Sequence, residues 1–238
     1  MSRKSLVTQV ADDVLDRIIG GELAVDELIP GELELCAALD VSRMTVREAI
    51  KILAAQGIIR VERGRGTYVN PVSMWSSLEA VLRATTEGVG AAAAAVQLIE
   101  LRRMLETGAC ELAASKISDA QLARLDELVS EMKAAHQEAD LDRFVDADLE
   151  FHDQILRASG NVFLAALFEP LGRVLASRRR ETSAFPQIQA HAIAEHEKIR
   201  QALGQRDSSR AREAMDGHMR QTLEDLNTFI LRQQAGKG

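Results

Sequence analysis

Apolar residues in the first third of the chain recur at the spacing of short helices. One helix is predicted over residues 5–19 and a second over Glu32–Leu39. Ser42 opens a longer helix, because its hydroxyl can accept a hydrogen bond from a free amide of the first turn. Two short apolar runs follow, joined by Arg63-Gly64-Arg65-Gly66. Helix, turn, helix and hairpin in this order predict a winged helix-turn-helix.

The rest of the chain is patterned for helices alone. Pro71 marks a boundary, since a continuing strand would need the amide that proline lacks. A linker helix is predicted over residues 74–90, ended by Gly88 and Gly90. Beyond it, short loops join the helices of a predicted antiparallel bundle. These helices are a first along the stripe Leu98 to Leu112, a second from Ser118, a third from Asp140 to Ser159-Gly160, a fourth from Val162 to about Ser177, a fifth from Gln187 to Leu203 and a last from Asp207.

The predicted fold class is mainly α, in three parts. Residues 1–70 form the winged helix-turn-helix, residues 71–95 the linker helix, and residues 96–238 an antiparallel all-α helical bundle. A chain of 238 residues is long enough for two domains, and its 46% hydrophobic content is enough to form their buried cores.

The cysteines and the hydropathy profile indicate the compartment. Cys36 and Cys110 both sit in helical patterns, so reduced thiols are expected rather than a disulfide, as in a cytoplasmic protein. The sequence contains no signal peptide and no apolar run of roughly 18 residues, the length that a membrane span needs. We therefore expect no membrane partner.

Positive charge is concentrated in the winged domain, although the whole chain carries a net charge of -7. Residues 41–66 hold six Lys or Arg and two acids, a local balance of +4. Arg43, Thr45 and Arg47 lie near the exposed N-terminal end of the helix that Ser42 opens. In a major groove, Arg can form a bidentate contact to guanine, while Thr can bond phosphate or pack on a thymine methyl.

The predicted wing adds a second basic element. Glycines 64 and 66 permit positive φ in the turn, which would bring Arg63 and Arg65 close to a phosphate backbone or a minor groove. The alternative is a small solvated helical hairpin with ordinary surface arginines. The basic wing beside the basic helix favours DNA binding.

Two polar side chains interrupt the apolar inward stripe of the third bundle helix. Asp148 and His152 are four residues apart, so both project from one face. His196 and His218 lie on the inward stripes of the fifth and last helices. A buried carboxylate is costly without a cation, and one carboxylate with three imidazoles suits Zn²⁺, or alternatively Ni²⁺, Fe²⁺ or Mn²⁺. The alternative for each histidine alone is a hydrogen-bonded core residue.

Other charged positions leave alternatives open. Arg102 shares the inner edge of the first bundle helix, where a buried guanidinium needs a carboxylate. Either Glu106, one turn further on, is its partner, or Arg102 and the metal together hold an acidic metabolite. The triple Arg178-Arg179-Arg180 is expected to be a solvated face, with an effector-lining or DNA-facing surface as the alternative. His136 and His191 are expected on the surface.

A resemblance to a known family is carried by the run PGELELCAALDVSRMTVREAIKILAAQGIIRVERGRGTYV. It resembles the DNA-binding domain of the GntR family of bacterial transcription regulators, and the likeness extends over about residues 5 to 70. The resemblance implies DNA contacts at Arg43, Thr45, Arg47, Arg63 and Gly64.

The chain departs from that family at Pro30-Gly31-Glu32-Leu33, where Pro-Ser-Glu-Arg is usual. Glycine is a tolerable N-cap, so folding is not threatened. Leu33 cannot donate to guanine, so the operator sequence is expected to differ from the usual one.

The bundle carries a second resemblance, in the runs ELRRMLETGACELAA, DLEFHDQILRASGN, EHEKIRQAL and AREAMDGHM. They are similar to the FCD-type effector domain of the FadR branch of the same family, over about residues 96 to 232. The resemblance implies Asp148, His152, His196 and His218 as metal ligands, and Arg102 as a contact to the carboxylate of a ligand. Many members of the branch bind small carboxylic acids or sugar acids.

The leading hypothesis is a ligand-responsive regulator, most often a repressor in this family, and not an enzyme. A homodimer would place two reading helices on a palindromic double-stranded operator. A small carboxylate effector would change the relative placement of the winged domains through the linker helix. The rival is a metal-dependent hydrolase or lyase with an accessory winged domain, although no clear general base lies beside the ligands. A third possibility is a winged-helix protein whose bundle only dimerises.

Overall fold

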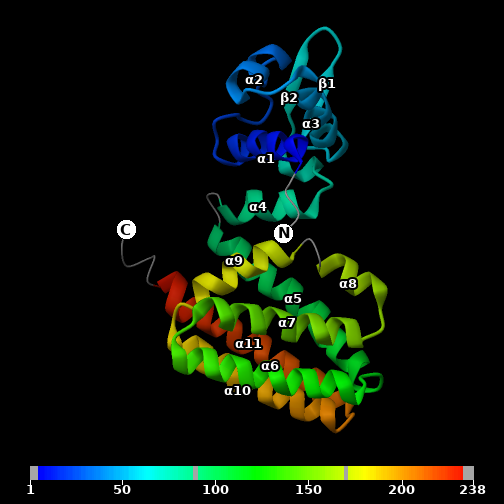
Figure 1. Ribbon diagram of the computed structural model, residues 1–238, viewed down its shortest axis with the longest axis vertical. Coiled ribbons are helices and arrows are strands. Elements are labelled where there is room, and N and C mark those ends of the chain that lie inside the picture. The colour runs from blue at the N-terminus through cyan, green and yellow to red at the C-terminus, as the bar shows by residue number, and fades with distance from the viewer. Residues whose placement is uncertain (1–4, 88–90, 169–170, 233–238) are drawn as a thin grey trace. The chain divides into compact units, whose positions relative to one another are not determined.

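The computed structural model describes residues 5–87, 91–168 and 171–232 (Figure 1). They divide between two compact units, Met1–Ala91 and Ala92–Gly238, each of which is mainly helical. The first has the order of a winged helix-turn-helix and the second is a helical bundle, which confirms the predicted fold class.

The first unit contains helices followed by one antiparallel hairpin. Its elements are α1 (Leu6–Ile19), α2 (Glu32–Leu39), α3 (Arg43–Ala55), β1 (Ile59–Glu62), β2 (Gly66–Val69), a 3₁₀ turn η1 (Val72–Met74) and α4 (Leu78–Glu87). In the hairpin, Ile59 lies opposite Val69 and Glu62 lies opposite Gly66. This register places the turn at residues 63–65, whereas the sequence predicted a connection over residues 63–66; Gly66 is the first residue of β2.

Local capping and a shared core explain why these helices form where they do. The Ser42 hydroxyl accepts a hydrogen bond from the Thr45 amide at 3.2 Å, and thereby caps α3. The buried face of α3, with Val46 and Leu53, packs against α1. This face orients the opposite side of α3 toward solvent.

The segment after the wing belongs to the core of the first unit. Trp75 is buried there, and its indole nitrogen donates to the Asn70 carbonyl at 3.0 Å. The helix predicted over residues 74–90 is observed as α4, whose Ala80 joins the same core. The predicted helix end at Gly88 and Gly90 lies outside the described residues.

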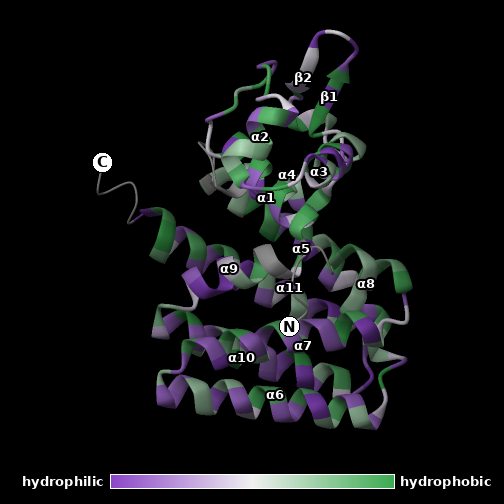
Figure 2. Ribbon diagram, turned by 45° about the horizontal axis from the view of Figure 1, so that its top comes forward, coloured by the Kyte–Doolittle hydropathy of each residue, from purple (hydrophilic) through white to green (hydrophobic). Residues whose placement is uncertain are grey.

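The second unit is built from long helices joined by short loops. Its elements are α5 (Ala91–Ala114), α6 (Asp119–Glu138), α7 (Leu141–Ala158), α8 (Val162–Phe168), α9 (Gly172–Thr182), α10 (Pro186–Gly204), α11 (Ser208–Asp225) and a π-helical segment η2 (Leu226–Leu231). Short loops make α6 and α7 one antiparallel pair and α10 and α11 another, and α6 packs on α10. Apolar and polar residues alternate along these helices, as expected where only one face is buried (Figure 2).

Two details of the bundle differ from the sequence expectation. The predicted fourth helix is described as two helices, α8 and α9. The buried face of α5 is also rotated from the predicted stripe, since Leu112 is exposed while Glu106 and Cys110 are buried. Both differences bring charged side chains into the bundle.

Two further expectations concern the thiols and the membrane. Cys36 and Cys110 are both free thiols. Within the described parts of the chain, every helix is too short or too polar to cross a bilayer.

Candidate metal centre and DNA-reading surface

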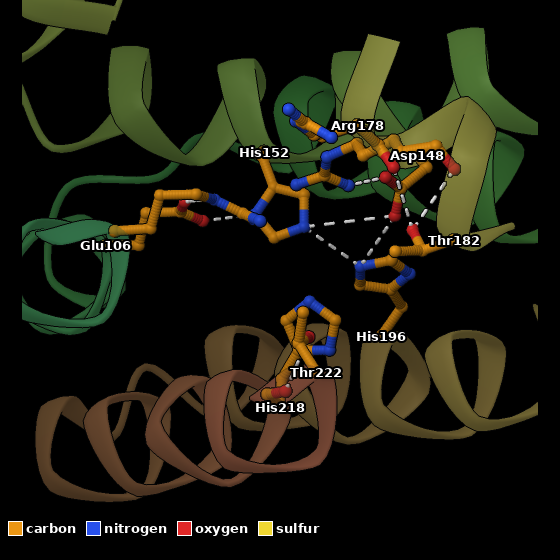
Figure 3. Close-up of polar contacts among 10 residues, drawn as sticks. Glu106, Asp148, His152, Arg178, Thr182, His196, His218 and Thr222 are labelled. Atoms are coloured by element: carbon orange, nitrogen blue, oxygen red, sulfur yellow. Dashed lines mark hydrogen bonds and ion pairs between the residues drawn. The ribbon is translucent and has the colours of Figure 1, made fainter. Parts of the chain in front are cut away.

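Three helices bring histidines together inside the bundle. Amphipathic α7 supplies Asp148 and His152 one turn apart on its buried face, α10 supplies His196, and α11 supplies His218. All four side chains are buried, and His196 is fully enclosed. The close-up in Figure 3 shows the rings of the three histidines converging. The structure therefore assembles the four residues that the sequence singled out.

The ring nitrogens of the three histidines lie close enough together to be ligands of one ion. Each of His152, His196 and His218 offers one nitrogen, and these three nitrogens all lie within 4.8 Å of one another. The Nε2 atoms of His152 and His196 are 3.2 Å apart. Two nitrogens bound to a tetrahedral Zn²⁺ at its usual bond length are separated by about 3.3 Å. The donor set thus fits a divalent transition metal.

The protonation state of the buried histidines also suits a cation. Burial holds the pKa of His196 and of His218 well below the ordinary histidine value, and the positive charges of Arg102 and Arg179 lower it further. Neutral imidazole is the form that coordinates a metal. These rings need no deprotonation before they can act as ligands.

Asp148 lies at the edge of the histidine cluster. One carboxylate oxygen, Oδ1, is 3.3 Å from Nε2 of His196 and 3.9 Å from Nε2 of His152. The other oxygen is ion-paired with Arg179 of α9. Asp148 is therefore placed to add a fourth ligand through Oδ1 while Arg179 compensates its charge.

Arg179 corrects the expectation that residues 178–180 form a solvated face. Its side chain is buried in the bundle, whereas Arg178 is half-buried beside Glu181 and Arg180 is exposed beside Asp142. The sequence could not show this, because the register of α9 depends on the helix break before it. Arg179 is thus a candidate site residue, a role that the sequence offered for this triple only as the alternative.

Arg102 has the carboxylate partner that was one of its two predicted roles. Its Nε donates to Oε1 of Glu106 at 2.7 Å, and both side chains are buried. Its Nη2 has no hydrogen-bond partner in the described structure, and neither does Nε of Arg179. Two buried guanidinium groups of the bundle thus keep hydrogen-bond donors that no described residue satisfies.

Glu106 also contacts the histidine cluster, which the sequence did not predict. Its Oε2 is bonded to Nδ1 of His152. Burial acts to raise the pKa of Glu106, but Arg102 and then His152 hold it well below the ordinary value. The link joins α5 to α7 across 46 residues of sequence, so no spacing pattern could have revealed it.

The predicted reading helix presents its arginines to solvent. Arg43 and Arg47 are exposed near the N-terminus of α3, and Thr45 is half-buried against the capping Ser42. Nε of Arg47 donates to both oxygens of Glu32, at 3.0 Å each. This contact fixes the stem of Arg47 and leaves its two Nη groups for a base edge.

The wing turn has the predicted backbone. Gly64 and Gly66 adopt φ of 75° and 125°, values that favour glycine. Arg63 and Arg65 are both exposed at the turn. Arg60, however, is held by Asp26 and Glu62, so one of the charges that the sequence assigned to the reading surface is neutralised within the fold.

Apolar side chains flank the reading arginines. Leu33 is 65% exposed and Met44 is 69% exposed. Leu33 is the residue expected from the sequence to alter the operator preference, whereas the sequence carries no prediction for Met44. A thymine methyl group is the apolar feature that a major groove offers to such side chains.

Comparison with known proteins accounts for both units. Residues 6–69 match the family model described as bacterial regulatory proteins, gntR family, and residues 97–221 match the model described as FCD domain. The chain is 30% identical to the HTH-type transcriptional regulator LutR of Bacillus subtilis over 90% of this chain and 97% of that protein.

Two other similar proteins are informative. The chain is 29% identical to the galactonate operon transcriptional repressor of Escherichia coli over 63% of this chain and 66% of that protein. A solved structure titled Streptococcus agalactiae GntR is 28% identical, covering 92% of this chain and 99% of that one, with a TM-score of 0.53.

Proposed function

The chain belongs to the GntR family of bacterial regulatory proteins, carries an FCD domain and is a transcription regulator rather than an enzyme, and from this premise we propose that it is a repressor released by a small carboxylic or sugar acid. The galactonate operon repressor, a relative, supports the class of effector. The observation that carries the sensing half is the buried histidine triad with two incompletely partnered guanidinium groups beside it.

We propose that the winged unit binds the major groove through α3. Arg43, Thr45 and Arg47 would contact bases and phosphates, and Arg63, Gly64 and Arg65 of the wing would contact the adjacent backbone or minor groove. The exposure of these arginines supports the assignment. The cytoplasm, where double-stranded DNA is accessible in a bacterium, is the expected compartment.

We propose that the bundle holds one divalent metal ion, with Zn²⁺ as the first candidate and Ni²⁺, Fe²⁺ or Mn²⁺ as alternatives. His152, His196 and His218 would be ligands, with Asp148 as the fourth. A bound ion of this kind would attract an anionic oxygen of the effector to an open coordination position. Arg102 and Arg179 would then bind the effector carboxylate through their unpartnered nitrogens.

The effector response is the direct test of this function. An acid that binds better to the DNA-free state should lower operator affinity by about 5- to 150-fold, the usual range of such coupling. The DNA would be an operator fragment that the protein selects from random duplexes. Fluorescence anisotropy at fixed salt, with Zn²⁺ present, would follow affinity against a panel of hydroxy acids and sugar acids that includes galactonate.

Arg102→Lys should weaken that response and leave DNA affinity unchanged. Lysine keeps a positive charge beside Glu106 but loses the planar fork that binds a carboxylate in two places. Arg103→Lys is the matched control, because Arg103 lies next on α5 and pairs with Asp216 at the surface. If no acid on the panel moves the operator affinity of the wild type, the proposed sensing function is wrong.

We also propose that the regulator acts as a homodimer, as a palindromic operator requires. In the bundle unit, α8 buries Leu164 and Phe168 but leaves Phe163 77% exposed, which offers an apolar contact to a second copy. Sedimentation at micromolar concentration should give twice the 26.1 kDa mass of one chain. Phe163→Ser should shift the distribution toward single chains, and a monomeric wild type would contradict the proposal.

A further inference from the structure

The Glu106 carboxylate occupies a position between the two halves of the proposed sensing site. Oε1 accepts from Nε of Arg102 at 2.7 Å. Oε2 is bonded to Nδ1 of His152 (Figure 3). We infer that Glu106 is a positioning residue that orients His152 as a metal ligand and ties it to the effector-binding Arg102. This inference rests on the proposed function, since it presupposes that the triad holds a metal.

The first step concerns which nitrogen of His152 carries the proton. An ionised carboxylate can only accept hydrogen bonds, so the Nδ1 that faces Glu106 must be the donor. The proton on Nδ1 leaves Nε2 with a lone pair. Nε2 is the nitrogen that lies 3.2 Å from Nε2 of His196, inside the triad. Glu106 therefore selects the form of His152 whose free electron pair faces the proposed ion.

The second step is the contrast with the other two histidines. Nδ1 of His196 and Nδ1 of His218 are buried and lack hydrogen-bond partners in the part of the chain that the structure describes. Within that part, His152 is thus the triad member whose outward nitrogen is held by a carboxylate. A carboxylate behind a metal-binding histidine fixes its ring and raises its basicity, and its loss typically weakens metal affinity 10- to 100-fold.

The third step is the link to Arg102. Because Glu106 engages Nε, the guanidinium plane of Arg102 is held by one edge while Nη2 stays without a partner in the described residues. One carboxylate thus holds both a metal ligand and an effector donor. The metal and the acid are consequently expected to bind cooperatively, and Glu106 is the residue that couples the metal site to the effector site.

Glu106→Gln is the variant that tests this role. The glutamine side chain has the same size, but its amide offers one acceptor oxygen and one donor nitrogen, so it cannot accept from His152 and Arg102 together. We expect Zn²⁺ affinity, measured by competition with a chromophoric chelator, to fall about 10- to 100-fold. Glu111→Gln is the matched control, because Glu111 lies on the same helix and pairs with Arg212 at the surface. Equal Zn²⁺ affinity in wild type and Glu106→Gln would overturn the inference.

A second measurement needs no change at Glu106. In the ¹⁵N-histidine NMR spectrum of the metal-free full chain, the signal of His152, assigned by its loss in His152→Asn, should show the proton on Nδ1. A proton on Nε2 would overturn the inference whether or not Glu106→Gln folds. The wild type could instead show the proton on Nδ1 of His152 but bind no Zn²⁺. In that case the proposed metal site is wrong, and Glu106 only forms polar contacts in the core. The two failures are thereby distinguished.

Discussion

Replacing His218 by alanine is expected to remove metal binding from the bundle while leaving DNA binding intact. Zinc sites with four protein ligands have apparent binding free energies of about 10 to 16 kcal/mol, so one ligand contributes roughly 3 kcal/mol. Zn²⁺ affinity should therefore fall by about 100-fold or more. Inductively coupled plasma mass spectrometry of the purified protein and chelator competition would measure the loss.

The same substitution should abolish thermal stabilisation by Zn²⁺. An ion at about 100 times its dissociation constant stabilises the folded state by about 2.7 kcal/mol, which corresponds to a rise in Tm of about 5 to 10 °C for a unit of this size. His218 suits the test, because its Nδ1 makes no hydrogen bond in the described structure and its removal leaves no buried charge unpaired. Asp148→Ala would be a poorer test, because it would leave the buried charge of Arg179 without its carboxylate partner and so destabilise the fold.

His191→Ala is the control for that experiment. His191 is another histidine of the same unit, but its exposed side chain pairs with Asp225 away from the triad. This variant should keep its metal and its response to Zn²⁺. Undiminished metal content in His218→Ala would exclude His218 as a ligand and leave the triad as a hydrogen-bonded core cluster.

The winged unit was predictable because its signals are local. Ser42 caps α3 by accepting from the amide of Thr45, only three residues away. Gly64 and Gly66 adopt the positive φ that glycine permits. The pairing of Arg60 with Asp26 was not predictable, because it depends on how the loop before α2 folds back onto β2, beside β1. Counting charges along the sequence therefore overstated the positive surface.

The histidine cluster was predictable for a different reason. On a long amphipathic helix, the phase of the apolar stripe fixes which polar residues face inward, and this placed Asp148, His152, His196 and His218 correctly. The partners of those residues come from helices whose phase the pattern left ambiguous. The phase of α5 differs from that of its leucine stripe, so the contact of Glu106 with His152 appeared only in the structure. The same holds for the contact of Arg179, on the separate helix α9, with Asp148.

Arg47→Ala is expected to have the second large effect, on operator recognition. Nε of Arg47 is already bound by Glu32, so the side chain is held in place before DNA arrives and its Nη groups can form a bidentate contact with guanine at little entropic cost. Losing such a contact costs about 1 to 3 kcal/mol, or about 5- to 150-fold in affinity.

Specificity distinguishes this role from simple charge attraction. Lys51, one turn further along α3, is exposed and pairs with Glu48, so Lys51→Ala removes the same charge from the same helix. If Arg47 reads a base, Arg47→Ala should weaken binding to the operator much more than to a scrambled duplex, whereas Lys51→Ala should weaken both slightly and equally. Anisotropy titrations of both duplexes at one salt concentration would separate these cases, because a phosphate contact contributes equally to both duplexes and a base contact does not. Equal losses on both duplexes in Arg47→Ala would assign Arg47 to the phosphate backbone and leave base recognition to Arg43 and the apolar side chains beside it.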